Sequence, residues 1–183
     1  MLRLIVALVA LVIVLAIGAM VVAFAIYQSS RRRVGYIPLP QRAVPAAIKA
    51  LSLPTTTDAY LYDLGCGDGR ILAAALRHHA KLRGVGIELN PLVATVARRK
   101  LRGMNAIILR GNLLKADLRP PTHVFTYLNH PTMAALEPKL AQELAPGARL
   151  VSCDFPLPQR QPNRIITIGH RGQLGQKLYV YEY

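Results

Sequence analysis

The stretch YLYDLGCGDGR, from Tyr60 to Arg70, is the part of the sequence that decides the fold. Tyr60–Tyr62 is a β-type run that ends in the carboxylate Asp63, and glycines follow at positions 65, 67 and 69. The alanine-rich run 71–76 comes next and is typical of a helix. Glycines allow tight turns and close ligand approach, and a helix N-terminus offers free N–H donors. The stretch therefore predicts a cradle for a nucleotide-like ligand.

Arg70 stands where the dinucleotide-binding pattern G-x-G-x-x-G has its third glycine, so that pattern is absent. The glycines instead follow D-x-G-x-G-x-G, which resembles the first motif of class I S-adenosylmethionine-dependent methyltransferases. An ordinary glycine-rich turn is the alternative, and the flanking strand and helix argue against it. The resemblance implies that the cofactor contacts Asp63, Gly65, Cys66, Gly67 and Gly69.

A second strand, Leu82–Glu88, ends in an acid 23 residues after Gly65. In nucleotide-binding βαβ units an acidic side chain near this distance accepts hydrogen bonds from ribose hydroxyls. A solvated glutamate at a strand end is the alternative. We expect Glu88, with Leu89 after it, to contact the adenosyl part of the cofactor.

Asn90 and Pro91 predict the start of a helix that continues to about Leu101 and ends at Gly103. Its last turn is basic, which complements the helix dipole. We therefore expect these basic side chains to be solvated rather than to bind nucleic acid. We expect it to bury Leu92, Val93, Val96 and Leu101.

A third strand, Ala106–Leu109, is followed by Gly111-Asn112. In methyltransferases of this type a polar side chain here commonly meets the adenine amino group. The resemblance gives that role to Asn112, with Leu113 beside it, and Asp117 is a weaker candidate.

The fourth strand, His123–Tyr127, leads into residues 128–131. Because the C-terminal ends of parallel strands line the ligand crevice, residues 127–130 should face the transferred methyl group. We therefore predict Tyr127 as a catalytic residue, and a substrate pocket formed by Tyr36, Leu128, Asn129 and His130.

The remaining sequence predicts a helix over Met133–Leu144 interrupted at Pro138, and a fifth strand over Arg149–Asp154. A proline-bearing loop replaces the next helix, and 164–168 with 177–181 form an antiparallel pair. The alternation of strands and helices predicts an α/β fold, a Rossmann-like class I methyltransferase sheet that is mostly parallel with an antiparallel C-terminal edge.

Leu4–Tyr27 contains no charged residue and no proline, and as a helix it would span about 36 Å, more than a hydrocarbon core of about 30 Å. Arg31–Arg33 follows, against Arg3 on the other side, and this asymmetry places the C-terminal part in the cytoplasm. A signal peptide cleaved after Ala23-Phe24-Ala25 is the alternative, for which the apolar run is too long. We predict that residues 1–30 form a single-pass transmembrane helix in the cell inner membrane.

Residues 31–58 form a basic, proline-bearing connector with a short helix around 46–51. The connector could close over the cofactor as a lid, with Tyr36 and Gln41 reaching the site, or serve only as a spacer. The catalytic domain is then residues 59–183.

The 183-residue chain has 23 Lys and Arg against 9 Asp and Glu, a formal charge of +14. That surplus favours an anionic partner such as lipid headgroups, nucleic acid or an acidic protein, although membrane proteins carry such charge for topological reasons too. Cys66 and Cys153 give neither a disulfide framework nor zinc spacing, so we expect reduced thiols and no bound metal.

Further segments match one family in order: Tyr36–Pro40, YDLGCGDGR, GVGIELNP, GNLLKADL and the runs 124–128, 136–140 and 146–152. Together they resemble the small seven-β-strand protein-lysine methyltransferases. That family includes membrane-anchored mitochondrial enzymes acting on the ATP synthase c subunit and the adenine nucleotide translocase, and archaeal relatives. The resemblance covers roughly residues 36–154, and residues 129–131 and 155–159 depart from it.

The expected function is that of a membrane-anchored methyltransferase that uses S-adenosylmethionine to N-methylate a lysine of a membrane-associated protein. In-line alignment supplies most of the catalysis, and Tyr127 would hold the amine through its hydroxyl and ring face. A lipid or small-molecule methyltransferase, an RNA methyltransferase and a non-catalytic cofactor-binding membrane protein are the alternatives. No (D/N)-P-P-(Y/F/W) motif follows the fourth strand, which disfavours nucleic acid as the substrate.

Overall fold

The computed structural model describes residues 11–21, 37–55, 58–79, 81–170 and 172–183. The chain divides into two compact units, Met1–Ile37 and Pro38–Tyr183. In the first unit, residues 11–21 form a helix with exposed side chains. No helix within the described ranges is both long and apolar enough to cross a bilayer. The predicted span Leu4–Tyr27 extends at both ends beyond the described residues, and Tyr36 also lies outside them.

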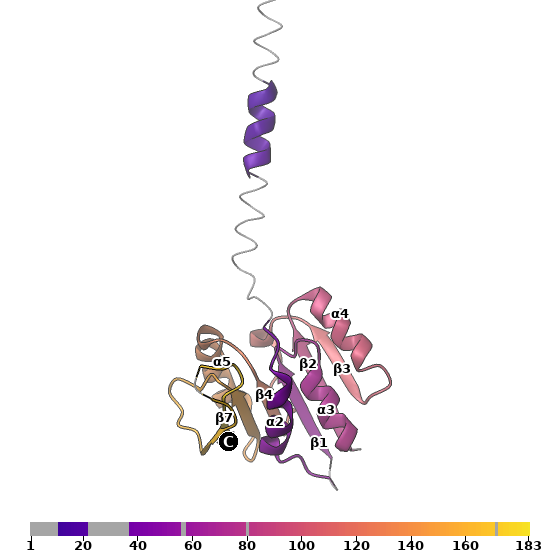
Figure 1. Ribbon diagram of the computed structural model, residues 1–183, viewed down its shortest axis with the longest axis vertical. Coiled ribbons are helices and arrows are strands. Elements are labelled where there is room, and N and C mark those ends of the chain that lie inside the picture. The colour runs from indigo at the N-terminus through magenta and orange to yellow at the C-terminus, as the bar shows by residue number, and fades with distance from the viewer. Residues whose placement is uncertain (1–10, 22–36, 56–57, 80, 171) are drawn as a thin grey trace, which may run out of the picture. The chain divides into compact units, whose positions relative to one another are not determined.

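The second unit is built on a seven-stranded sheet in the order β3-β2-β1-β4-β5-β7-β6 (Figure 1). β7 is antiparallel to β5 and to β6, and the other neighbouring strands are parallel. This topology confirms the predicted sheet, mostly parallel with an antiparallel C-terminal edge. The strands are β1 (Ala59–Leu64), β2 (Leu82–Glu88), β3 (Ala106–Arg110), β4 (His123–Thr126), β5 (Arg149–Cys153), β6 (Arg164–Thr167) and β7 (Lys177–Glu182).

Helices cover both faces of this sheet, with an apolar core on each side. α2 (Val44–Leu51), α3 (Arg70–His78) and α4 (Pro91–Lys100) share one core with inward side chains of the strands, among them Leu61 and Phe125. Figure 1 shows α2 and α3 side by side on this face. α5 (His130–Glu143) packs on the opposite face, in the core that contains Leu64, Val124, Met133, Leu136 and Leu140.

The segment before β1 packs as part of the second unit. A 3-10 helix, η1 (Gln41–Ala43), leads into α2, which has Pro45 in its first turn. The buried side chains of α2 are spaced as on one face of an amphipathic helix, at Val44, Ala47, Ala50 and Leu51. The compact unit therefore begins at Pro38, ahead of the boundary at residue 59 that we placed between connector and catalytic domain.

α5 differs from its prediction at both its start and its middle. It begins at His130 because the Asn129 side chain accepts a hydrogen bond from the Thr132 N–H and caps the helix. It continues through Pro138, so the predicted interruption there is wrong. Pro138 and Ala134, four residues earlier, are both exposed, and water can satisfy the carbonyl that the proline leaves without a donor.

The predicted buried face of α4 is wrong for two of its four residues. Leu92 is 78% exposed and Val96 is 50% exposed. The helix instead turns Ala94, Ala97 and the following Leu101 inward. Small alanines let α4 approach the glycine turn, where a Cβ on Gly69 would lie 3.4 Å from the Ala97 Cβ atom.

Candidate active site

The glycine turn is fastened to the end of β2 by backbone hydrogen bonds. The N–H groups of Gly65 and Cys66 both donate to the Ile87 carbonyl, at 2.8 and 3.0 Å. All three glycines have left-handed backbone angles, with φ of 77° at Gly65, 55° at Gly67 and 75° at Gly69. Such angles are costly for other residues, so the sequence of the turn is dictated by its conformation.

Glu88 closes the turn from the β2 side. Its Oε2 atom accepts from the Gly67 N–H at 3.0 Å, and its Oε1 atom accepts from the Asn90 N–H at 2.8 Å. These bonds hold the carboxylate in place, and a carboxylate oxygen has a second lone pair for a ribose hydroxyl. Leu89, which directly follows β2, is 63% exposed. Leu113, which comes shortly after the neighbouring strand β3, is half-buried. The adenosyl contacts of Glu88, Leu89 and Leu113 stay predictions.

Asp63, just before the glycine turn, has a strongly raised carboxyl pKa. Its side chain is 3% exposed at the end of β1, and burial, together with the charges of Glu88 and Asp68, raises its pKa to about 8. None of the described residues donates a hydrogen bond to its carboxylate. A buried acid in this state fits a ligand group of positive charge, because such a group would stabilise the carboxylate form.

The Cys66 side chain packs against β2. Its side chain is 5% exposed, and burial is the main cause of a raised thiol pKa. A Cβ on Gly86 of β2 would lie 2.7 Å from the Cys66 Sγ atom, so the glycine in β2 makes room for the turn. Position 66 therefore requires a small side chain, and Gly86 is the other half of that contact.

An ion-pair network that the sequence analysis did not identify ties the turn to three other elements. Arg70 pairs with Asp68 at 2.8 Å and donates to the Leu39 carbonyl of the connector. Lys100 of α4 also pairs with Asp68. Although burial opposes it, the hydrogen bonds from Arg70 and Lys100 lower the pKa of Asp68 to about 2. The only sequence signal was the charge alternation in Asp68-Gly69-Arg70.

Asn112 lies after β3, as expected, and is exposed. Its Oδ1 atom accepts from the Leu114 N–H at 3.0 Å and caps the 3-10 helix η2 (Leu113–Lys115). The remaining lone pair of that oxygen is the acceptor an adenine amino group would need. Asp117, the weaker candidate, is exposed and paired with Arg119 at 2.8 Å.

The predicted acceptor residues converge at the ends of β4 and β5. The Tyr127 ring centroid lies 5.9 Å from that of Phe155, and the His130 ring meets Phe155 edge-on at 5.0 Å. A Cβ on Gly65 would come within 2.7 Å of Leu128, so Leu128 covers the glycine turn. Asn129 serves as the cap of α5. Phe155 lies in residues 155–159, which we noted only as a departure from the family resemblance, and its ring contacts both Tyr127 and His130.

Tyr127 is half-buried, and its pKa is raised to about 12, mainly by burial and also by the nearby Asp154. The charge of Arg42 acts in the opposite direction on the same hydroxyl. At neutral pH the hydroxyl therefore keeps its proton and can donate one hydrogen bond and accept others. It is suited to orienting an amine and unsuited to removing its proton.

Two carboxylates hold the loops around this acceptor side. Asp154 has a left-handed φ of 61° and accepts from the N–H groups of Gly175, Gln176 and Lys177, the last at 3.0 Å. Glu137 of α5 is 8% exposed and accepts from the N–H of Arg160 at 2.7 Å. Neither role could be predicted from the sequence, because the partners of both carboxylates are backbone N–H groups, which carry no side-chain signature.

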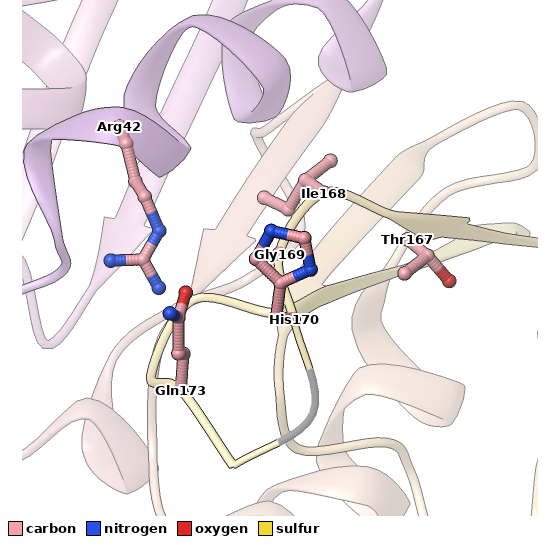
Figure 2. Close-up of a pocket in the computed structure, with 6 residues that line it drawn as sticks. All are labelled: Arg42, Thr167, Ile168, Gly169, His170 and Gln173. Atoms are coloured by element: carbon pink, nitrogen blue, oxygen red, sulfur yellow. The ribbon is translucent and has the colours of Figure 1, made fainter.

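A cavity of about 310 Å³ lies between the connector and the loop that joins β6 to β7. Its lining residues are Arg42, Thr167, Ile168, Gly169, His170 and Gln173. Figure 2 shows the Arg42 side chain reaching toward Gln173, and its guanidinium donates to the Leu174 carbonyl. The cavity is separate from the glycine turn, and Arg42 links it electrostatically to Tyr127.

Comparisons with known proteins agree with this geometry. Residues 63–164 match the ANTKMT methyltransferase domain family. The chain is 31% identical over 153 residues to a protein-lysine N-methyltransferase of Saccharolobus islandicus (strain REY15A), covering 81% of this chain and 92% of that protein. It is 38% identical over 144 residues to the adenine nucleotide translocase lysine N-methyltransferase of Mus musculus, covering 76% of this chain but only 61% of the mouse protein.

Among solved structures, the chain resembles an RNA methyltransferase from Salinibacter ruber in complex with S-adenosyl-L-homocysteine. The two are 33% identical with a TM-score of 0.71, over 80% of this chain and 93% of that chain. A methyltransferase from Geobacter sulfurreducens, also with S-adenosyl-L-homocysteine, shares the fold at 18% identity and a TM-score of 0.56, over 72% of this chain and 56% of that chain.

The sheet order, the left-handed glycine turn and the acid at the end of β2 define a class I methyltransferase whose cofactor is S-adenosylmethionine. Within that class, the chain belongs to the ANTKMT methyltransferase domain family. The buried carboxylate of Asp63, which accepts no hydrogen bond from a described residue, fits this cofactor, which carries a sulfonium and an ammonium group.

Proposed function

We propose that this protein N-methylates a lysine side chain of a membrane-associated protein and is itself anchored in the cell inner membrane. The observation that carries the choice of lysine is the family match over residues 63–164, with two relatives named as lysine N-methyltransferases. The mouse relative is named for a translocase, and this chain spans 61% of its length. Target and location are therefore argued from the residues below.

The cofactor half of the site would hold S-adenosylmethionine through Asp63, Glu88 and the glycine turn. Asp63 would face the positive charge of the cofactor, and Glu88 would accept from its ribose. Asn112, with Leu89 and Leu113, would contact the adenine. When bound, the cofactor supplies an electrophilic methyl group on sulfur, and the amine nitrogen takes the methyl carbon while the sulfur keeps the bonding electrons.

The acceptor half of the site suits a primary amine. Tyr127 would accept a hydrogen bond from a neutral amine, and the Phe155 and His130 rings near it would contact a methylated ammonium product. Half-burial of Tyr127 places the amine in a partly dry setting, which lowers the pKa of a lysine and favours its neutral, nucleophilic form. The proton released passes to water, since Tyr127 keeps its own proton at neutral pH.

The anchor would place this site at the cytoplasmic face of the membrane. Residues 11–21 are helical, with exposed apolar side chains that include Leu11, Ile13, Leu15 and Ile17. They form the centre of the uncharged run Leu4–Tyr27, and Arg31–Arg33 follows it. By the positive-inside rule the catalytic domain is then cytoplasmic. Tethering raises the effective concentration of the enzyme near membrane-embedded targets.

RNA is a second candidate substrate because the Salinibacter ruber neighbour is described as an RNA methyltransferase at 33% identity. The surplus of basic residues in this chain is compatible with RNA binding.

One experiment separates these functions. The full chain is incubated with a membrane extract and S-adenosylmethionine labelled on its methyl group, and the label is followed into protein bands, RNA and lipid. Our proposal predicts label in a protein band, recovered as methyl-lysine after hydrolysis. Label confined to RNA or to lipid would replace it by the corresponding alternative.

A matched pair of proteins tests the anchor. The full chain and residues 38–183, which contain both apolar cores, are compared in the same assay. We expect the full chain to stay with membranes after carbonate washing and to label its target faster than the shorter protein. Equal labelling by both would show that anchoring does not determine the target.

A further inference from the structure

α4 carries its largest apolar side chains on the outside. Leu92, 78% exposed, and Val96, 50% exposed, are four residues apart and so lie on one face of the helix. The opposite face holds Ala94 and Ala97 in the core. An apolar stripe on the solvent side of a helix at the sheet edge is not explained by folding, since folding leaves both side chains in water.

The same face of α4 is strongly basic. Arg99 continues the stripe one turn after Val96, and Arg102 follows the helix. Neither guanidinium makes a hydrogen bond or ion pair with any described residue. Two neighbouring cations are already engaged, since Arg98 donates to the Ile108 carbonyl at 3.0 Å and Lys100 pairs with Asp68. No Asp or Glu occurs from residue 89 to residue 110.

This combination selects among partners. An apolar stripe edged by unpaired arginines is the surface that an interfacial helix offers to an anionic bilayer, with apolar side chains below the phosphates and cations among them. The partner must therefore offer anionic groups above an apolar layer, and a bilayer that contains anionic phospholipid offers both. The exposed Ile107 and Leu109 of β3 lie outside this surface, because Ile108 between them packs in the core shared with α4 and alternate side chains of a strand point to opposite faces.

We propose that the outer face of α4, formed by Leu92, Val96 and Arg99, docks on the anionic phospholipid surface of the membrane together with Arg102, which follows the helix. This inference rests on the proposed membrane location of the enzyme. Docking would give the catalytic domain a fixed orientation on the bilayer, in addition to the tether. Because α4 follows the Glu88 end of β2, the cofactor half of the site would lie toward the lipid.

The chain contains no tryptophan, so a single introduced tryptophan reports on one position. Leu92→Trp and Val96→Trp are made separately in the full chain and reconstituted into vesicles of phosphatidylcholine, with or without phosphatidylglycerol, that carry brominated acyl chains. Ile165→Trp on β6, at the other edge of the sheet and 55% exposed in the parent protein, is the matched control. Val14→Trp reports on the anchor.

In anionic vesicles we expect bromine to quench the emission of the tryptophans at positions 92 and 96 at least about two-fold more than that at position 165. Adding Arg99→Gln and Arg102→Gln, or high salt, should remove most of this difference. Equal quenching at positions 92, 96 and 165, with the tryptophan at position 14 quenched, would overturn the docking while leaving the anchor intact. Quenching at position 92 but not at position 14 would support docking and remove the anchor, and quenching at neither would remove both.

Discussion

The two halves of the site are built by different means. In the cofactor half, the hydrogen bonds that the backbone of the glycine turn makes stay within the unit of β1, α3 and β2, as in the bond from the Gly67 N–H to Glu88, 21 residues away. The acceptor half combines Tyr127 and Phe155 with the connector, whose Arg42 reaches the Leu174 carbonyl 132 residues later. A local motif can therefore specify where the cofactor binds, whereas the acceptor site depends on the completed sheet.

The largest expected effect comes from a residue at which both halves meet. Gly65→Ala adds a Cβ at 2.7 Å from Leu128 and forces a side chain into a left-handed backbone with φ of 77°. We expect the affinity for S-adenosyl-L-homocysteine, measured by calorimetry, to fall about 100-fold, because the left-handed backbone opposes a side chain and the turn or the Leu128 side chain must also shift.

Gly103→Ala is the control that isolates backbone strain. Its φ is 80°, but a Cβ there meets nothing within 4 Å, so both variants share a left-handed cost of about 1–2 kcal/mol. If Gly103→Ala weakened binding as much as Gly65→Ala, contact between the turn and Leu128 would not be what matters.

The next prediction concerns Asp63→Asn, which removes a charge from the cofactor half of the site and hardly changes the size of the side chain. The folded-state pKa of Asp63 is about 8, above its unfolded value of 3.8, so folded protein holds a proton that unfolded protein lacks between these pH values. This group therefore makes the wild type less stable as pH rises through that window. Asp63→Asn should be more stable than the wild type by about 2–5 kcal/mol at pH 9, and nearly equal at pH 4.

The same substitution should weaken cofactor binding by about 10- to 100-fold at pH 8, because the positive charge of the cofactor loses its partner. Urea unfolding at pH 4 and 9, with calorimetry at pH 8, measures both effects. A variant that lost stability at pH 9 would show that Asp63 is paired in the free protein, against our description of the site.

Tyr127→Phe tests the acceptor half alone. Removing the hydroxyl should slow single-turnover methylation about 10-fold, since one orienting hydrogen bond is lost, while the cofactor affinity stays within about two-fold of the wild type. Because the pKa of Tyr127 is about 12, its ionisation should not shape the pH–rate profile between pH 6 and 10. An unchanged rate would exclude Tyr127 from catalysis.

These halves also differ in how far the sequence could predict them. The glycine spacing and the acid that ends β2 predicted where the turn lies, because its geometry is set by local backbone angles and by bonds within one strand–helix–strand unit. The errors arose where tertiary packing decides. Ala94 and Ala97 were preferred over Leu92 and Val96 because the approach of α4 to the turn leaves little space. Pro138 was tolerated because its face of α5 meets water.

The acceptor side could be predicted only in outline. Tyr127 and His130 were identified from the position of a strand end, but their common neighbour Phe155 comes from the loop after another strand. The roles of Asp154 and Glu137 depend on backbone N–H groups, which carry no side-chain signature in the sequence.

The last prediction compares the two halves through the labelling rates of their thiols, since each half contains one buried cysteine. Cys66 lies in the glycine turn and Cys153 ends β5, and burial is the main cause of a raised pKa for both thiols. Both should react slowly with a thiol reagent at neutral pH, at rates limited by local opening. Cys153→Ala leaves Cys66 as the reporter of the cofactor half, and Cys66→Ala leaves Cys153 as the reporter of the acceptor half.

Saturating S-adenosyl-L-homocysteine stabilises the closed form of the half that binds it, so Cys66 labelling should slow about 10-fold or more. Cys153 labelling should change less than about two-fold if the acceptor half opens independently. Equal slowing of both thiols would show that the two halves open as one unit. The acceptor site would then be coupled to the glycine turn, and the contact between Leu128 and Gly65 is the first place at which that coupling could be transmitted.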